Sequence, residues 1–408
     1  MTTPDTKRFL PFAAPDIGDQ EIREVARTLR SGWLTTGERA QRFEQQFKNY
    51  VGAPHALALN SGTGALHVAL AALGIGPGDE VITTPLTFCA TVNVILEVGA
   101  TPVLADIGHD LNIDPAEVRR AITLRTRAIL PVHVAGLSCE MDRIWSIASE
   151  FGLYVVDDAA HATGAYYRGH PIGAGDSNAV AFSFYATKNL CTGEGGMVTT
   201  HSTELADRMK MLSLHGISRD AWNRYSENGT WYYEVVDCGF KYNMSDIAAA
   251  MGLVQLKRLD GMNARRAEIA QRYNAAFVEI PEVETPPERE DCRHAWHLYI
   301  LRLNLDRWTI DRARFINEMK RRGIGCSVHF IPIPLHPYYR KTLESRDPCT
   351  TALAEYPRLL SLPLYSKMTD EDVGRVIEAV RDIVVRNSVR QTVAFDKLEA
   401  ACAVEADD

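Results

Sequence analysis

The sequence predicts an α/β protein, in which a large domain built on a mostly parallel sheet is followed by a smaller α+β domain. Three observations lead to this prediction. From about residue 55 to residue 200, β-type runs alternate with helical patterns. Several of these runs are continuously apolar, which is typical of strands buried on both faces of a parallel sheet. After Met244 the alternation ends, and a long helical stretch leads into a mixture of strands and helices.

The elements of the first part can be assigned in chain order. Strands are expected at residues 55–60, 81–83, 101–106, 128–133, 153–157, 179–184 and 197–200. Helices are expected at residues 63–73, 91–98 and 141–151. A further helix should begin near Asp114, which can act as its N-cap, because Pro115 suits the first helical position.

The second part has a different pattern. Residues 245–273 place apolar side chains on one face of one or two long helices, whereas residues 280–292 are rich in Pro and Glu and suit a surface connection. Strands are expected at residues 297–303 and 326–330, and helices at residues 312–322 and 370–386. We expect the large domain to span residues 14–260, the small domain residues 261–392 together with 1–13, and a fraying tail residues 393–408.

The composition excludes several classes of protein. The chain has 408 residues, of which 46% are hydrophobic and 24% charged, and its net charge is −8. These are ordinary values for a soluble enzyme, and the acidic balance argues against nucleic acid or an anionic membrane as a partner. No apolar run approaches the ~20 residues of a membrane helix, and the N-terminus shows no secretory signal. The eight scattered cysteines lack metal-ligand spacing, so we expect reduced thiols, no metal and a cytoplasmic location.

Three short segments carry residues suited to chemistry. The first, Asn60-Ser61-Gly62-Thr63-Gly64-Ala65, lies between an expected strand and an expected helix. There Gly62 would let backbone N–H groups approach an anion, and Thr63 would add a hydroxyl. The segment therefore predicts a phosphate cradle, although a plain helix-capping turn would give the same pattern. It is neither a dinucleotide-binding fingerprint nor a Walker loop.

The second segment ends an apolar strand with Asp157 and Asp158, and His161 follows three residues later. Open parallel sheets bind ligands at this end of their strands. Asp158 is therefore a candidate for holding a cationic ring nitrogen, and His161 for bonding the same ligand. The alternative is an aspartate that caps the following turn beside a packed histidine, which is the role we favour for Asp157.

The third segment leads from an apolar strand through Ser183 to Lys188, before the glycine-rich residues 193–196. A lysine in an uncharged neighbourhood loses part of the stabilisation of its ammonium form, which makes the amine nucleophilic. A phosphate cradle, a carboxylate for a ring nitrogen and a buried lysine together meet the needs of pyridoxal 5'-phosphate. Phe88 is a candidate for stacking on the cofactor ring, with core packing as its alternative.

With these motifs the chain resembles the DegT/DnrJ/StrS family of pyridoxal-phosphate sugar aminotransferases, whose fold is that of aspartate aminotransferase (fold type I). The resemblance extends from residues 31–37 to residues 360–364. It implies that Lys188 bonds to the cofactor aldehyde, that Asp158 holds the pyridine nitrogen and that His161 lies near the phenolic oxygen. It also implies that Phe88 stacks on the ring. The implied phosphate ligands are Gly62, Thr63 and Ser183.

Many members complete the phosphate site with an asparagine of the partner subunit, within the motif Gly-Tyr-Asn-Tyr-Arg. Here the corresponding residues 239–243 are Gly-Phe-Lys-Tyr-Asn. The resemblance therefore makes Asn243 the candidate for that role and a homodimer with shared sites the expected assembly.

Within the family, residues 32–37, 241–243, 294–297 and 323–330 most resemble the branch that makes UDP-4-amino-4-deoxy-L-arabinose. This resemblance implies transfer of the amino group of L-glutamate to a keto group, at position 4, of a nucleotide-linked sugar in amino-sugar and polysaccharide biosynthesis. His329 is a candidate contact to the sugar or its diphosphate, and a structural histidine of the small domain is an equal alternative. Related dehydratases carry histidine in place of the lysine, so Lys188 favours transamination.

Other functions stay open at this point. Aminocyclitol formation or transamination at position 3 of a sugar would use the same cofactor. A non-catalytic regulatory paralogue would keep the fold but purify as a colourless protein. A nicotinamide dehydrogenase is disfavoured because no Gly-x-Gly-x-x-Gly follows any strand.

Overall fold

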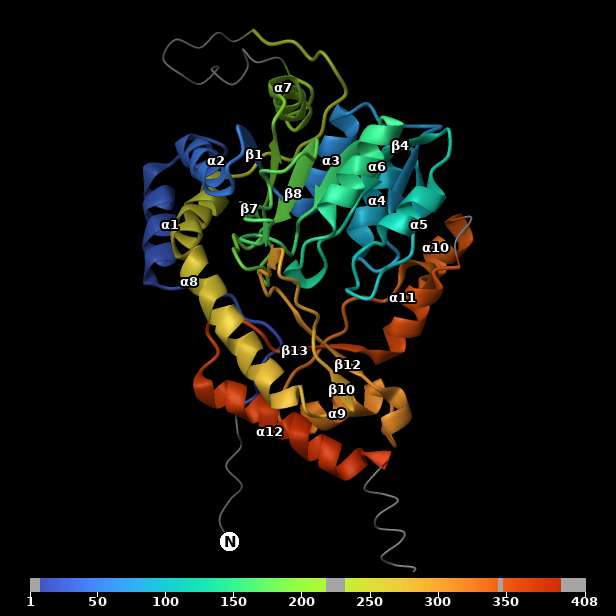
Figure 1. Ribbon diagram of the computed structural model, residues 1–408. Coiled ribbons are helices and arrows are strands. Elements are labelled where there is room, and N and C mark those ends of the chain that lie inside the picture. Colours follow the sequence, from blue (N-terminus) through green and yellow to red (C-terminus); the bar gives the residue numbers. More distant parts are fainter. Residues whose placement is uncertain (1–7, 218–231, 344–347, 390–408) are drawn as a thin grey trace, which may run out of the picture.

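The computed structural model describes residues 8–217, 232–343 and 348–389, and a seven-stranded sheet forms its centre (Figure 1). The strand order is β1-β9-β8-β5-β4-β2-β3. The strands are β1 (His55–Leu59), β2 (Glu80–Thr83), β3 (Thr101–Leu104), β4 (Thr126–Leu130), β5 (Tyr154–Asp158), β8 (Ala179–Ser183) and β9 (Gly196–Thr200). Strand β9 runs antiparallel to both its neighbours and the other pairings are parallel, which confirms the expected mostly parallel sheet.

Helices cover both faces of this sheet. The helices are α2 (Glu38–Val51), α3 (Gly62–Ala72), α4 (Cys89–Glu97), α5 (Pro115–Ala121), α6 (Met141–Phe151) and α7 (Thr203–Leu212). Helices α2, α5 and α6 share one apolar core with the sheet, and α3, α4 and α7 share the other. In β5, Val155 belongs to the first core and Val156 to the second, because successive strand residues point to opposite faces. Asp114 caps α5 by accepting a hydrogen bond from the N–H of Ala116, as expected.

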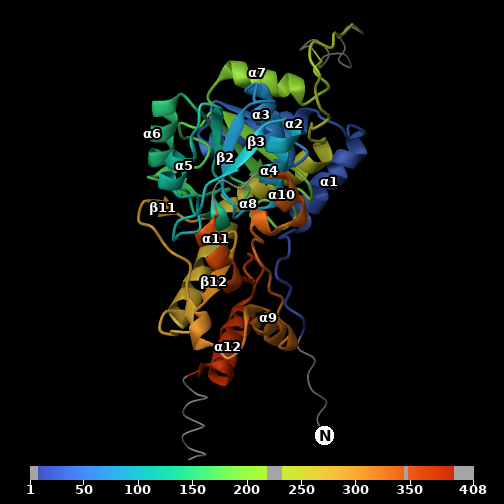
Figure 2. The same cartoon turned by 90° about the vertical axis from the view of Figure 1, so that its right-hand side faces the viewer.

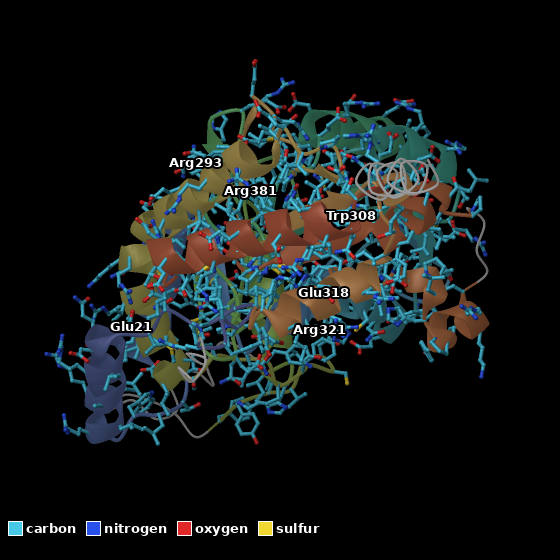
Figure 3. All side chains as sticks on the ribbon, turned by 90° about the horizontal axis from the view of Figure 1, so that it is seen from below. Glu21, Arg293, Trp308, Glu318, Arg321 and Arg381 are labelled. Carbon is cyan, nitrogen blue, oxygen red and sulfur yellow. The ribbon has the colours of Figure 1, made fainter. Side chains whose placement is uncertain are left out.

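A second, smaller layer lies beneath this sheet (Figure 2). Its antiparallel sheet consists of β10 (Val283–Glu284), β12 (Tyr299–Leu303) and β13 (Leu359–Leu362). Helices α9 (Arg312–Arg321) and α12 (Asp370–Asn387) pack on it beside the end of a long helix, as seen from below in Figure 3, where Arg321 marks α9 and Arg381 marks α12. The remaining elements are α1 (Asp19–Ser31), α10 (Pro337–Thr342), α11 (Thr350–Glu355) and a sheet of β6 (Tyr166–Tyr167), β7 (His170–Pro171) and β11 (Cys292–Arg293).

The long helix is α8 (Asp246–Phe277), which joins the two layers (Figure 1). Ser245 caps it by accepting a hydrogen bond from the N–H of Ala248. Leu253 lies in the core of the seven-stranded sheet, whereas Tyr273 lies in the core of the smaller sheet. The stretch expected to form one or two helices is therefore a single helix, and the boundary expected near residue 260 falls inside it.

The structure differs from the expected elements in several places. Residues 326–330 do not form the expected strand, and Ser327 makes a single bridge to Ser361 instead. The third strand of the smaller sheet is β13, which the sequence did not predict. All four of its residues are buried, so its short run lacks the alternation of polar and apolar residues that indicates a strand. The polar amphipathic helices α1, α2 and α7 also lie outside the expected elements. The tail at residues 393–408 lies outside the described residues.

Candidate active site

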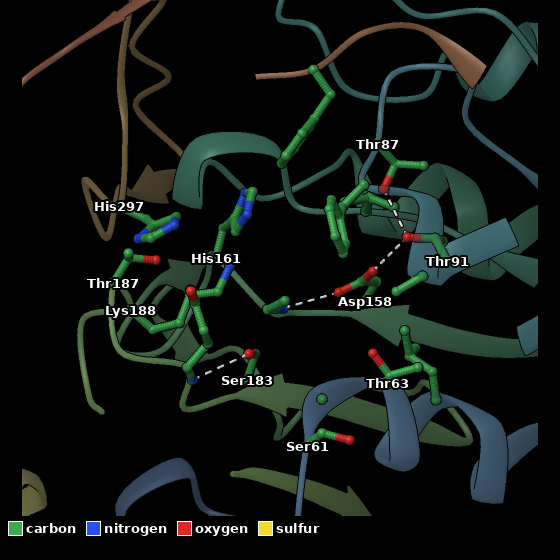
Figure 4. A pocket seen from close by; sticks show the side chains of 18 of the residues that line it. Ser61, Thr63, Thr87, Thr91, Asp158, His161, Ser183, Thr187, Lys188 and His297 are labelled. Carbon is green, nitrogen blue, oxygen red and sulfur yellow. Dashed lines mark hydrogen bonds between the residues drawn. The ribbon is translucent and has the colours of Figure 1, made fainter. Parts of the chain in front are cut away.

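A cavity of about 510 Å³ opens where β5 and β8 end and α3 begins (Figure 4). This is the end of a parallel sheet at which ligands bind in open α/β folds. The predicted site residues that line it are Gly62, Thr63, Phe88, Asp158, His161 and Ser183, together with Lys188 and His329. Segments far apart in the sequence thus meet at one site.

The bottom of the cavity in Figure 4 is formed by the start of α3 and the end of β8. Ser61 caps α3 by accepting a hydrogen bond from the N–H of Gly64, at 3.0 Å. The first N–H groups of a helix have no partner within the helix and carry its positive dipole end, so they suit an anion. A Cβ on Gly62 would lie 2.8 Å from Cβ of Ser183, which shows why glycine is needed for this close approach. The hydroxyls of Thr63 and Ser183 line the same end of the cavity.

Gly196 supports this cradle from β9, and its replacement tests the cradle. A Cβ at position 196 would lie 2.3 Å from the carbonyl oxygen of Ser61 and 2.6 Å from the nitrogen of Gly62. Gly196→Ala is therefore expected to displace the start of α3 and weaken pyridoxal-phosphate binding about tenfold or more. Titration of cofactor absorbance measures this. Gly261→Ala is the control, because a Cβ there meets nothing within 4 Å, and equal affinities of the two variants would contradict the prediction.

Asp158 lies at the opposite side of the cavity from Lys188 in Figure 4. Its carboxylate is 6% exposed and accepts hydrogen bonds from the Thr91 hydroxyl at 2.8 Å and from the N–H of Ala160 at 3.1 Å. The hydroxyls of Thr91 and Thr87 are themselves 2.7 Å apart. Burial raises the pKa of Asp158, while the hydrogen bonds and the charges of Lys188 and His133 oppose that rise. The result is a fixed, desolvated carboxylate that would pair strongly with a protonated ring nitrogen.

Asp157 points away from this cavity, as alternation along β5 requires. Its carboxylate accepts a hydrogen bond from the Ser177 hydroxyl at 2.8 Å and lies 3.5 Å from Nε2 of the buried His133. This placement agrees with the structural role favoured for Asp157.

Lys188 follows β8 in a turn, where its N–H donates to the carbonyl of Tyr185. Burial lowers the pKa of Lys188 to about 8, against an opposing effect of the Asp158 charge. The cavity therefore holds an amine that is half neutral near pH 8, more than two pH units below an ordinary lysine, and can act as a nucleophile.

The pH dependence of cofactor capture tests this shift. A lysine with a lowered pKa gains its neutral form as pH rises through that pKa, so the rate at which cofactor-free protein captures pyridoxal phosphate should be half-maximal near pH 8 and level off about one pH unit above it. Stopped-flow absorbance from pH 6 to 10 measures the rate, with Lys188→Ala as the baseline. A rate that rises steadily up to pH 10, as for an ordinary lysine, would contradict the lowered pKa of Lys188 and its burial in the cavity.

The upper part of the cavity is lined by aromatic rings and imidazoles. Nδ1 of His161 accepts a hydrogen bond from the N–H of Ala135 at 3.3 Å. The His161 ring lies 5.7 Å from the ring of Phe330, and Phe330 lies 6.1 Å from Phe88, measured between centroids. Phe88 is 59% exposed, so it is not a core residue in this chain. Nδ1 of His329 lies 2.8 Å from the hydroxyl of Ser361.

Asn243 does not line the cavity of its own chain. Its amide oxygen accepts a hydrogen bond from Nζ of Lys241 at 2.6 Å, and its amide nitrogen donates to the Thr36 hydroxyl at 2.6 Å. It bridges Leu59, two residues before Ser61. A role for Asn243 in a phosphate site therefore stays a prediction about the partner subunit.

Thr91 and His297 are among the cavity residues that the sequence did not indicate as site residues. Thr91 lies three residues after Phe88 on α4, so helical spacing could have indicated that both face the same site. His297 lines the cavity from the C-terminal part of the chain, and its position depends on long-range packing.

The donor set fits pyridoxal 5'-phosphate. An anion cradle, a buried carboxylate and a buried amine line one cavity, and these are the three groups that the phosphate, the ring nitrogen and the aldehyde require. Within residues 8–217, 232–343 and 348–389, no group of three His, Cys, Asp or Glu side chains is placed to hold a metal ion. The same residues include no helix that is both long and apolar enough to cross a membrane.

Comparison with known proteins agrees with this geometry. The model of the DegT/DnrJ/EryC1/StrS aminotransferase family matches residues 15–381. The spore coat polysaccharide biosynthesis protein SpsC of Bacillus subtilis is 56% identical over 380 residues, covering 92% of this chain and 97% of that protein.

Solved structures are similar over almost the whole chain. Spr1654 of Streptococcus pneumoniae in its PMP form has a TM-score of 0.86 at 35% identity, covering 92% of this chain and 99% of that one. Its PLP form has a TM-score of 0.85. PseC of Helicobacter pylori, an aminotransferase involved in the biosynthesis of pseudoaminic acid, has a TM-score of 0.86 at 30% identity, covering 92% and 99%. These relatives confirm the fold type I architecture and pyridoxal 5'-phosphate as the cofactor, and the chain belongs to the DegT/DnrJ/EryC1/StrS aminotransferase family.

Proposed function

We propose that this chain transfers the amino group of L-glutamate to a keto group, at position 4, of a nucleotide-linked sugar, in the biosynthesis of amino sugars for a polysaccharide. The convergence of the Gly62–Thr63 cradle, Asp158 and Lys188 on one cavity carries the proposal. The printed names of SpsC and PseC, which refer to polysaccharide and pseudoaminic acid biosynthesis, support a sugar as the acceptor. We place the reaction in the cytoplasm, as expected from the sequence.

The chemistry divides between the cofactor and the chain. When bound, pyridoxal 5'-phosphate supplies an aldehyde that reacts with amines and a ring that takes up electrons from the α-carbon of the donor. Nζ of Lys188, which lines the cavity, would carry the proton that leaves that α-carbon, acting as general base and then as general acid. Asp158, oriented by Thr91 and the N–H of Ala160, holds the proton on the ring nitrogen. The start of α3, with Thr63 and Ser183, binds the phosphate.

Product analysis tests the proposal. The holoenzyme is incubated with L-glutamate and with UDP- and TDP-linked keto sugars, and products are identified by mass and NMR. We expect 2-oxoglutarate and a sugar with an amine at position 4. A product with the amine at position 3 of a sugar, or on a cyclitol, would contradict the proposed substrate. A colourless protein without either half-reaction would instead indicate a regulatory paralogue.

We further propose a homodimer in which Asn243 of the partner subunit completes each phosphate site. Asn243→Leu should weaken cofactor binding by about 10- to 100-fold, the effect of one lost hydrogen bond to a charged group. Mixed dimers of Asn243→Leu and Lys188→Ala should regain activity at subsaturating cofactor, because one of their two sites then carries neither change. If the activity of the mixed dimers did not exceed that of either single variant, the site would not be shared between subunits.

A further inference from the structure

The side chain of Asn189, the residue after Lys188, has a fixed orientation. Its amide nitrogen donates to the carbonyl of Ala295 at 2.7 Å and to the amide oxygen of Asn263 at 2.8 Å. Asn263 is oriented in turn, because its amide nitrogen donates to the carbonyl of Thr163 at 3.1 Å. Backbone carbonyls only accept hydrogen bonds, so neither amide can be flipped without placing two oxygens together.

This orientation determines the tautomer of His297. The amide oxygen of Asn189 lies 3.2 Å from Nδ1 of His297, and an amide oxygen can only accept, so Nδ1 carries a proton. Burial lowers the pKa of His297 well below its ordinary value, and repulsion between a protonated His297 and the cationic groups around it, led by Lys188, acts in the same direction. The imidazole is therefore neutral, and its Nε2 carries a bare lone pair.

His161 has the opposite tautomer. Its Nδ1 accepts a hydrogen bond from the N–H of Ala135, so in the neutral ring Nε2 carries the proton. Burial and the charges of Lys188 and His329 lower the pKa of His161 as well. The two rings lie 4.4 Å apart between centroids, and both line the cavity. A hydrogen-bond donor and a hydrogen-bond acceptor are thus built side by side.

The backbone holds these two rings firmly. The same residue, Ala135, donates its N–H to His161 and accepts the backbone N–H of His297 at 2.9 Å. Nη1 of the buried Arg266 donates to the carbonyls of Trp296 and His297, both at 3.3 Å, and to a third carbonyl, of Leu364, at 2.8 Å. The direction of the His297 lone pair is therefore preset rather than adaptable.

We propose that the amino group of Lys188 turns toward the bare Nε2 of His297 during turnover and donates a hydrogen bond to it, so that His297 positions the amine for proton transfer. Figure 4 shows His161, His297 and Lys188 on one side of the cavity, with Asp158 on the other. Within the described residues, burial and the charge of Asp158 determine the pKa of Lys188, and no side-chain hydrogen bond contributes to it. His297 acts here as a positioning residue, and its role in turnover rests on the proposed function.

The tautomers can be measured without any reaction. Histidine-selective ¹⁵N labelling and long-range ¹H–¹⁵N NMR of the cofactor-free protein distinguish a protonated ring nitrogen from a bare one. We expect the proton on Nδ1 of His297 and on Nε2 of His161. In Asn189→Leu the His297 proton is expected to be no longer confined to Nδ1. A proton on Nε2 of wild-type His297 would overturn the proposal whatever the substrate.

The donor half-reaction tests the consequence for Lys188. At saturating L-glutamate, followed by cofactor absorbance, His297→Leu should be slower by about 10- to 100-fold with little change in the concentration needed for half-saturation. His297→Gln keeps an acceptor oxygen and should retain most of the rate. The exposed His170, replaced by leucine, is the control. Equal rates for the leucine and glutamine variants at position 297, or a loss confined to the sugar half-reaction, would overturn the proposal. A wild-type protein that does not react with glutamate would instead contradict the proposed donor, and the NMR result would still decide the tautomer.

Discussion

Lys188→Ala is expected to abolish turnover and the visible absorbance of the protein–cofactor complex. The side chain lies buried in the cavity with a pKa lowered to about 8, so it supplies both the nucleophile for the aldehyde and the proton carrier for the reaction. Loss of both roles should lower the rate by at least about 10⁴-fold. Spectroscopy of the purified variant and detection of 2-oxoglutarate measure the two losses.

A matched variant separates chemistry from folding in this experiment. Lys320→Ala removes an exposed lysine of α9, outside the cavity, and should keep the visible absorbance. Circular dichroism and thermal melting should show that Lys188→Ala is folded, because it removes a buried amine rather than an apolar packing group. Retention of both colour and turnover in Lys188→Ala would refute the assignment of this lysine.

Asp158→Asn is expected to leave cofactor binding largely intact but slow the donor half-reaction by about 10²- to 10³-fold. Asparagine has nearly the same shape and can still accept the hydrogen bond of Thr91, but it has no negative charge to keep a proton on the ring nitrogen. The ring then takes up electrons less readily. Rapid-mixing absorbance with saturating L-glutamate measures the rate.

The neighbouring aspartate provides the control for Asp158→Asn. Asp157→Asn makes the same chemical change one residue earlier, on the other face of β5, where the carboxylate contacts Ser177 and His133. We expect it to lower thermal stability because the buried contacts of the carboxylate with Ser177 and His133 are disturbed, while the half-reaction rate stays close to that of the wild type. If both variants lost the same activity, the loss would result from a disturbance of β5 rather than from the missing charge of Asp158.

The segments that carry the chemistry could be predicted because they are local. Each lies within a few residues of the end of an apolar strand, and a parallel sheet brings those ends together. Gly62, Asp158 and Lys188 could therefore be assigned to one cavity without knowing any tertiary contact. The strands β4 and β5 could also be predicted, because short, continuously apolar runs are typical of strands buried on both faces of a parallel sheet.

The remaining parts depend on contacts between distant segments. His297 is held at the cavity by contacts with the distant residues Ala135, Asn189 and Arg266, and nothing in the residues around it in the sequence distinguishes it from a packed histidine. β13 is a strand because β12 supplies its pairing partner, and the segment at residues 326–330, with comparable β propensity, finds only a single bridge. The local sequence pattern does not determine which of two such segments becomes a strand, because tertiary packing determines which of them pairs with β12.

Helix α8 has a consequence for exchanging parts between relatives. Leu253 and Tyr273 belong to different cores on one uninterrupted helix, so a chimera joined between them would take the helix residues of each core from the parent that supplies most of that core. A junction after Phe277 would instead set Tyr273 and Phe277 of one parent against the smaller sheet of the other. A junction between the two cores could therefore move the segment that brings His297 and His329 to the cavity together with its own core, with the cofactor machinery left in its original scaffold.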